Sequence, residues 1–101
     1  MAKTSSIEKN KRRARLAKQN AGRRARLKKI AMDKTASMDE RFQATLKLAE
    51  LPRNSAKIRV RNRCEVTGRP RGFYRKLKMS RIALRDLGAA GHVPGLVKSS
   101  W

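Results

Sequence analysis

Small and hydrophobic residues recur at helical intervals through the first third of the chain. Residues 7–31 are mostly good helix formers without proline, and Ala14, Ala17, Ala21 and Ala25 follow at steps of three and four. This spacing predicts one long helix with a narrow stripe of small side chains. Its remaining surface is almost entirely cationic, and like charges at helical spacings repel one another. We therefore expect the helix to lie along an anionic partner such as a phosphate backbone.

Residues 37–50 are predicted to form a second helix with well-marked ends. Ser37 and Glu40 are spaced as a capping box, in which the hydroxyl accepts from the Glu40 amide and the carboxylate accepts from the Ser37 amide. Pro52 cannot continue a helix and ends the segment. The two predicted helices would form a hairpin that turns near Asp33–Ala36.

The apolar residues of the second segment are expected to share one face. This face comprises Met38, Phe42, Leu46 and Ala49, broadened by Leu48 and Leu51. We expect it to pack against the end of the first helix, around Leu27, Ile30 and Ala31. A functional Met or Phe box on this face is the alternative, and core packing is favoured over it.

The chain after the second helix has weaker periodicity. Residues 53–59 are predicted to be an extended or irregular link to a basic segment that contains glycine and proline. Ser80 is placed as the N-cap of a short helix through Leu87. Either Gly88 or Gly91 would close that helix.

Charge strengthens the case for a polyanionic partner. The 101 residues include 28 lysines and arginines and seven acidic residues, which gives a formal net charge of +21. A near-neutral segment, residues 31–52, separates two basic blocks, residues 1–30 and 53–81. This charge repels itself in a compact body, and the chain has few large apolar side chains to offset the repulsion.

The densest basic block is Arg59–Arg81, which contains nine lysines and arginines and one acid, Glu65. Three helix-breaking residues, Gly68, Pro70 and Gly72, lie among the cations and precede the rings of Phe73 and Tyr74. Arginine forks fit phosphate oxygens, and aromatic rings stack on unpaired bases. The combination favours an RNA-binding segment over a solvated basic loop. We call this segment, Arg59–Arg81, the knuckle.

The predicted fold class is therefore mainly α, small and extended. Residues 1–52 would form a basic helical N-terminal extension and hairpin. Residues 53–101 would form the RNA-binding knuckle, the short helix and a C-terminal tail.

Cysteine and histidine are too few for several classes of protein. Cys64 is the only cysteine, so the chain has no intramolecular disulfide, and we expect a reducing, cytoplasmic setting. With His92 as the one other candidate, no catalytic constellation is present, and we expect no enzyme activity and no cofactor. No run is apolar enough to span a bilayer or to serve as a secretory signal.

The run RNRCEVTGRPRGFYRKLKMSRIALRDL and the ending VPGLVKSSW, with the basic start, resemble the family of bacterial small-subunit ribosomal protein fourteen in its longer, zinc-independent form. The resemblance covers nearly the whole chain. It implies a structural protein of the 30S subunit that binds 16S ribosomal RNA in the head, near the aminoacyl-tRNA site, and supports assembly. It also implies small-subunit proteins three, ten and nineteen as neighbours, without a membrane or a homo-oligomer.

The shorter form of this family binds zinc through two C-x-x-C pairs, and the corresponding positions here are Cys64, Thr67, Ser80 and Ala83. Alanine has no donor, and hydroxyls are poor zinc ligands. We therefore expect a zinc-ribbon-like knuckle without metal, stabilised by packing around Cys64 and Ile82. A second departure is the run Lys76-Leu77-Lys78-Met79, which stands where the family usually has Lys-Phe-Gly-Leu.

The resemblance also assigns ribosomal RNA contacts. They fall on Arg59, Arg61, Asn62, Arg63, Thr67, Gly68, Arg69, Pro70, Arg71, Gly72, Arg75, Lys76, Ser80 and Arg81, and in the tail on Lys98, Ser99, Ser100 and Trp101. On the long first helix we expect further contacts to backbone phosphates from Arg12, Arg13, Arg23, Arg24 and Lys28.

Two other functions are compatible with a strongly basic chain. A DNA-compacting protein would use the cationic helix on duplex DNA. A membrane-active peptide would need bulky apolar residues opposite the cations, and the first helix offers alanines there. Ribosomal RNA is the favoured partner.

Overall fold

A computed structural model describes residues 2–100, which belong to two compact units. One unit is Glu8–Val60, and the other combines Met1–Ile7 with Arg61–Trp101. Residues 53–60 thus group with the helices, whereas the sequence predicted a boundary after residue 52. None of the helices in the described part of the chain is long and apolar enough to cross a membrane.

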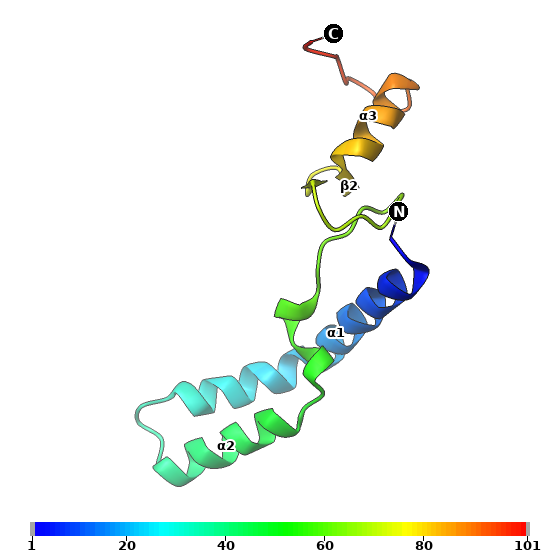
Figure 1. Ribbon diagram of the computed structural model, residues 1–101. Helices are drawn as coiled ribbons and strands as arrows, with labels where there is room; N and C mark the ends of the chain where they lie inside the picture. Colours follow the sequence, from blue (N-terminus) through cyan, green and yellow to red (C-terminus); the bar gives the residue numbers. More distant parts are fainter. Residues whose placement is uncertain (1, 101) are drawn as a thin grey trace. The chain divides into compact units, whose positions relative to one another are not determined.

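The predicted helical hairpin is present and forms most of the Glu8–Val60 unit. Helix α1 spans Thr4–Met32, somewhat longer than predicted, and α2 spans Met38–Glu50. The two helices run in opposite directions on either side of a short connection (Figure 1).

The connection between the helices is set by two side chains. The Asp33 carboxylate accepts hydrogen bonds from the Thr35 hydroxyl at 2.7 Å and from the Thr35 amide at 2.9 Å, and these bonds lower the pKa of Asp33. The Ser37 hydroxyl then accepts from the Glu40 amide at 3.3 Å, which is the serine half of the predicted capping box.

The face of α2 that packs inward differs from the predicted one. The buried or half-buried residues are Arg41, Ala44, Leu48 and, just after the helix, Leu51. The predicted core residues Met38, Phe42 and Leu46 are 77%, 63% and 44% exposed, and Ala49 is exposed as well. Of the expected contacts on α1, Leu27 and Ala31 are half-buried, whereas Ile30 is exposed.

Arg41 explains this rotation of α2. Its Nε donates to the Ala31 carbonyl at 3.2 Å, at the C-terminal end of α1. Carbonyls in the last turn of a helix have no partner within the helix and favour a cationic donor. Because Arg41 must point toward α1, the residues one and two turns after it, Ala44 and Leu48, also point inward. The predicted face therefore turns away.

The link after α2, predicted to be extended or irregular, forms two short 3-10 helices. These are η1 (Arg53–Ser55) and η2 (Lys57–Arg59). Ser55 is only 1% exposed. Its hydroxyl donates to the Pro52 carbonyl and accepts from Arg24 Nε at 3.0 Å, while another Arg24 nitrogen donates to the Pro52 carbonyl at 3.2 Å.

Asn54 makes a second set of bonds between the link and the helices. Its Oδ1 accepts from Arg13 Nε of α1 at 3.4 Å and from Arg59 of η2 at 3.1 Å. The alanines of the predicted stripe contribute little, because Ala14, Ala21 and Ala25 are exposed. Arginine hydrogen bonds, rather than a large apolar interior, therefore connect α1 to the link.

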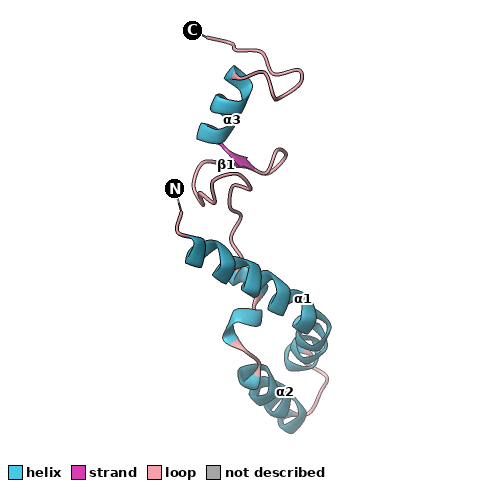
Figure 2. Ribbon diagram, turned by 90° about the vertical axis from the view of Figure 1, so that its right-hand side faces the viewer, coloured by secondary structure: helices cyan, strands magenta, loops and turns pink. Residues whose placement is uncertain are grey.

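The second unit contains a two-stranded hairpin and a short helix. Strand β1 (Phe73–Tyr74) pairs antiparallel with β2 (Met79–Ser80), and Phe73 lies opposite Ser80. Helix α3 (Arg81–Ala89) follows β2 directly. Figure 2 shows β1 beside the first turn of α3.

The predicted N-cap of α3 is confirmed, and the helix continues to Ala89, two residues beyond the predicted Leu87. The Ser80 hydroxyl accepts from the Ala83 amide at 3.2 Å, so Ser80 is the N-cap. At the other end Gly91 has φ +78°, and the His92 amide bonds to the Leu87 carbonyl at 2.9 Å. This is the pattern of a Schellman motif, so Gly91 rather than Gly88 closes the helix.

We expect Arg24→Ala to destabilise the Glu8–Val60 unit by about 1–3 kcal/mol, because Ser55 and the Pro52 carbonyl lose a charged donor. The measurement is urea unfolding followed by far-ultraviolet circular dichroism, with sulfate present to screen the net charge. Arg23→Ala removes the same charge from an exposed neighbour and should cost less than about 0.5 kcal/mol. Equal losses would show that charge, not these bonds, determines stability.

Candidate nucleic-acid interface

The knuckle is a tight turn closed by backbone hydrogen bonds. The Gly68 amide donates to the Cys64 carbonyl at 2.8 Å, and the Cys64 amide donates to the Arg69 carbonyl at 3.0 Å. The Glu65 amide donates to the Lys78 carbonyl at 3.1 Å, which ties the turn to the hairpin loop. Arg63 adds a side-chain bond to the Gly68 carbonyl at 3.0 Å.

The N-terminal residues pack against this turn at Gly68. Gly68 has φ +78°, and a Cβ there would lie 2.6 Å from Cδ1 of Ile7 and 3.3 Å from the Cβ of Ala2. Only glycine satisfies both the conformation and the close approach. No periodicity or motif in the sequence pointed to this contact.

The Cys64 thiol is buried in the centre of the turn. Burial raises its pKa, but hydrogen bonds from the Thr67 side chain and from the Ser80, Thr67 and Val66 amides outweigh burial and lower the pKa to about 6. The sulfur therefore has the environment of a thiolate.

The donor set around Cys64 does not fit zinc. Ser80 is fully buried, and its hydroxyl already accepts from the Ala83 amide. Thr67 supplies one hydroxyl and Ala83 only a methyl group, so one soft ligand remains. Within residues 2–100 no three His, Cys, Asp or Glu side chains come together as a metal site would require. The expected packing around Ile82 is wrong, since Ile82 is exposed and Ala83 is the buried residue.

The hairpin loop contains a strained residue. Four residues, 75–78, connect β1 to β2, and the Lys78 amide donates to the Tyr74 carbonyl at 2.7 Å. Lys78 has φ +54°, in the left-handed region that glycine adopts without strain. It is the position at which the related family usually has glycine.

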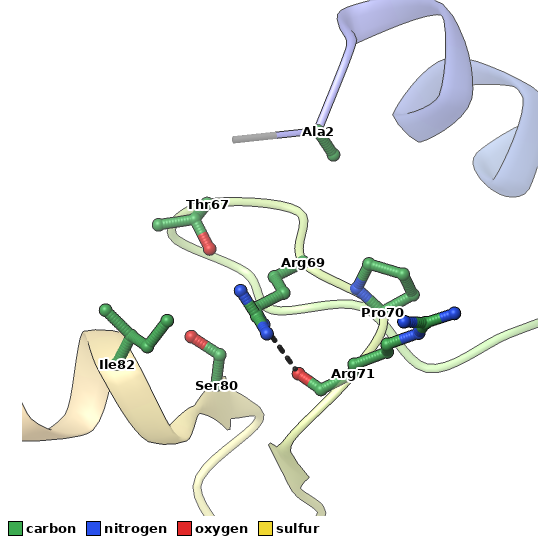
Figure 3. A pocket seen from close by; sticks show the side chains of 7 residues that line it. All are labelled: Ala2, Thr67, Arg69, Pro70, Arg71, Ser80 and Ile82. Carbon is green, nitrogen blue, oxygen red and sulfur yellow. Dashed lines mark hydrogen bonds between the residues drawn. The ribbon is translucent and has the colours of Figure 1, made fainter.

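Five of the predicted contact residues line a hollow of about 560 Å³ on the knuckle. They are Thr67, Arg69, Pro70, Arg71 and Ser80, and Ala2 and Ile82 complete the lining. Figure 3 shows Arg69 reaching across the hollow, where its Nε donates to the Arg71 carbonyl at 3.3 Å, and the Arg71 guanidinium beside Pro70. Arg71 is exposed, so its guanidinium is accessible to an anion.

A second hollow, of about 670 Å³, lies between α3 and the tail. It brings together the predicted residues Arg81, Lys98, Ser99 and Ser100 with Tyr74 and Arg85. The tail approaches α3 at Gly88, where an added Cβ would collide with the side chain of Leu96. Arg85 was not among the predicted residues, although its position one turn after Arg81 on α3 was a usable signal.

The predicted cations fall into two groups by their exposure. The half-buried members, which also bond to groups within the protein, are Arg13, Arg24, Arg59, Arg63 and Arg69. The exposed members are Arg12, Arg23, Lys28, Arg61, Arg71, Arg75, Lys76, Arg81 and Lys98. Their contacts with RNA stay predictions, and only the second group presents its charge outward.

The other predicted contacts divide in the same way. Asn62, Gly72, Ser99 and Ser100 are exposed, whereas Gly68 and the hydroxyl of Ser80 are buried inside the knuckle. Of the two rings, Tyr74 is 51% exposed and Phe73 is half-buried. Trp101 lies outside the described residues.

The fold and this surface define a small, mainly helical protein whose exterior is dominated by arginine and lysine. Residues 47–100 match the family described as ribosomal protein S14p/S29e. The chain is 70% identical to the small ribosomal subunit proteins uS14 of Bartonella bacilliformis and Brucella ovis and 69% identical to that of Brucella anthropi, in each case over 101 residues and the full length of both chains.

The chain therefore belongs to the ribosomal protein S14p/S29e family. Membership makes it a structural component of the bacterial small ribosomal subunit, located in the cytoplasm as part of the ribosome, and not an enzyme.

We expect Lys78→Gly to stabilise the hairpin by up to about 1 kcal/mol, because glycine removes the left-handed strain and loses only part of that gain to chain entropy. Lys76→Gly removes the same charge from the same loop at a position without positive φ, so it should be destabilising. Hydrogen exchange at the Lys78 and Glu65 amides measures both effects. Slower exchange in the Lys76 variant would contradict this account.

We expect the knuckle to gain stability as the pH rises from about 6 to about 9. Over that range the folded state carries a Cys64 thiolate while the unfolded chain still carries a thiol, so unfolding takes up a proton. The free energy of unfolding rises by at most about 1.4 kcal/mol per pH unit over this range. This added stability is lost as the pH falls through 6. Thiolate absorbance near 240 nm gives the pKa directly. A pH dependence that survives Cys64→Ala would contradict the assignment.

Proposed function

We propose that the chain binds 16S ribosomal RNA in the head of the small subunit, supports assembly there and shapes the region near the aminoacyl-tRNA site. The observation that supports this most strongly is the cluster of exposed cations around the glycine-containing turn and hairpin. Arg71, Arg75, Lys76 and Arg81 all present their charge outward within a short stretch of chain. The seven acidic residues could neutralise at most a quarter of the 28 cations.

The mechanism is charge neutralisation on a shaped surface. Segments of RNA backbone repel each other where they converge, and arginine forks bonded to phosphate oxygens remove that repulsion. The knuckle holds these guanidinium groups in a fixed arrangement, because its turn is closed by the backbone hydrogen bonds of Gly68 and Cys64. Tyr74, half exposed beside the second hollow, offers a flat face for an unpaired base.

The same location implies protein neighbours. We propose small-subunit proteins three, ten and nineteen in this role, on the family resemblance described above. The Glu8–Val60 unit is the suitable part of the chain, because residues 31–52 carry three basic and four acidic side chains and so attract phosphate weakly.

We expect the double replacement of Arg71 and Arg75 by alanine to weaken binding to the 3′ major domain of 16S RNA at least about tenfold and to lower the slope of log K against log salt by roughly 1.5. Filter binding over a range of salt concentrations measures both. Replacing exposed Lys9 and Lys18 of α1 by alanine removes the same charge and should cost less than about threefold.

Two results would contradict the proposal. Equal losses from the two double variants would mean that total charge, not the knuckle, determines binding. Equal affinity for duplex DNA and for the structured 16S domain would favour a DNA-compacting protein instead.

A further inference from the structure

One lysine of the hairpin loop has a backbone conformation that lysine seldom adopts. Lys78 has φ +54°, and the other four positive values of φ among residues 2–100 all belong to glycines. Two backbone hydrogen bonds impose this conformation. The Lys78 amide donates to the Tyr74 carbonyl at 2.7 Å, and the Lys78 carbonyl accepts from the Glu65 amide at 3.1 Å. Because a residue with a Cβ is strained in this region, folding alone favours glycine at this position.

The side chain of Lys78 does not offset this strain within the protein. It is exposed, so its methylene groups are not packed in the interior. Its ammonium forms no ion pair within residues 2–100, although Glu65 is its backbone partner. Strain at a residue without internal contacts persists where the side chain serves a function. The function of Lys78 therefore lies in the positive charge that it presents to solvent.

The residues around Lys78 indicate what kind of partner this charge meets. Arg75 and Lys76 belong to the same loop and are exposed as well. The sequence contains no acidic residue between Glu65 and Asp86. Cations gathered in one short loop repel one another, and a ligand with closely spaced negative charges relieves that repulsion. The phosphates of an RNA backbone are such a ligand, whereas a single carboxylate of a protein would neutralise only one of the cations.

We propose that Lys78 binds a phosphate of 16S ribosomal RNA, and that the hairpin keeps a strained lysine because its charge is required at this point of the interface. The two backbone bonds fix the point beside Arg75 and Lys76 from which the side chain extends. Lys78 thus lowers the stability of the free protein and raises its affinity for RNA. The inference rests on the proposed function in one respect, that the phosphate belongs to the RNA proposed there.

The test measures stability and RNA affinity in the same full-length variants. Lys78→Gly removes both the strain and the charge, so we expect slower hydrogen exchange at the Glu65 amide together with weaker binding to the 3′ major domain of 16S RNA. The affinity should fall at least about threefold, and the slope of log K against log salt should fall by roughly 0.7. A residue with a merely structural role would not move stability and affinity in opposite directions.

Two further variants separate the charge of Lys78 from its backbone conformation. Lys78→Gln keeps a long side chain and the strain but removes the charge, so it should lose at least about threefold in affinity, as the glycine variant does. Lys78→Arg keeps the charge and should bind within about twofold of the parent. Filter binding over a range of salt concentrations measures all three variants.

Lys47→Gln is the matched control, because it removes the same charge from an exposed position on α2, outside the knuckle. It should lower the affinity less than about 1.5-fold. Equal affinities of the two glutamine variants, an equal loss in Lys78→Arg, or faster exchange in Lys78→Gly than in the parent would each overturn the inference alone. Normal RNA affinity but poor incorporation of Lys78→Gln into small subunits would overturn it in favour of an acidic protein partner. A parent chain that does not prefer the 16S domain to duplex DNA would instead contradict the proposed function, and the inference with it.

Discussion

The structure depends on arginine hydrogen bonds to a few buried polar groups. The two most buried side chains are Ser55, at 1% exposed, and Ser80, at 0%, and both are serines rather than apolar residues. The Ser55 hydroxyl accepts a hydrogen bond from Arg24. The Ser80 hydroxyl caps α3, and the Ser80 backbone bonds to the Cys64 sulfur. Since the buried apolar residues are small or few, the apolar interior contributes little, and the specific geometry of these bonds fixes how the elements meet.

The same residue type consequently has two roles in this chain. Arginines that point inward, such as Arg13 and Arg24, replace a core by bridging segments far apart in sequence. Arg71 instead points outward, and no carboxylate within residues 2–100 forms an ion pair with it. Arginine suits both roles because its planar fork has several donors and stays charged when half-buried. A protein of this size can thereby use one kind of side chain both for folding and for presenting charge at its surface.

Sequence reasoning succeeded where structure is local and failed where it depends on distant contacts. Both N-caps, Ser37 and Ser80, and the turn at Asp33 are short-range hydrogen-bonding patterns, and all three are present. The orientation of α2 was missed because it depends on Arg41 reaching a carbonyl ten residues away, which a count of apolar positions ignores. The contact of Ile7 with Gly68 joins residues 61 positions apart and leaves no periodic trace.

The candidate interface shows the same division. Gly68, Pro70 and Gly72 predicted a break in helical structure, and the turn from Cys64 to Arg69 is present, since these residue types act through their own backbone. Which arginines face outward could not be read from composition, because Arg63 and Arg71 differ only in what lies beside them. Charge alone would also have treated α2 as an inert spacer. In the structure α2 packs against α1 through the face that Arg41 sets and exposes Met38, Phe42 and Leu46, and residues 31–52, with three basic and four acidic side chains, attract phosphate weakly.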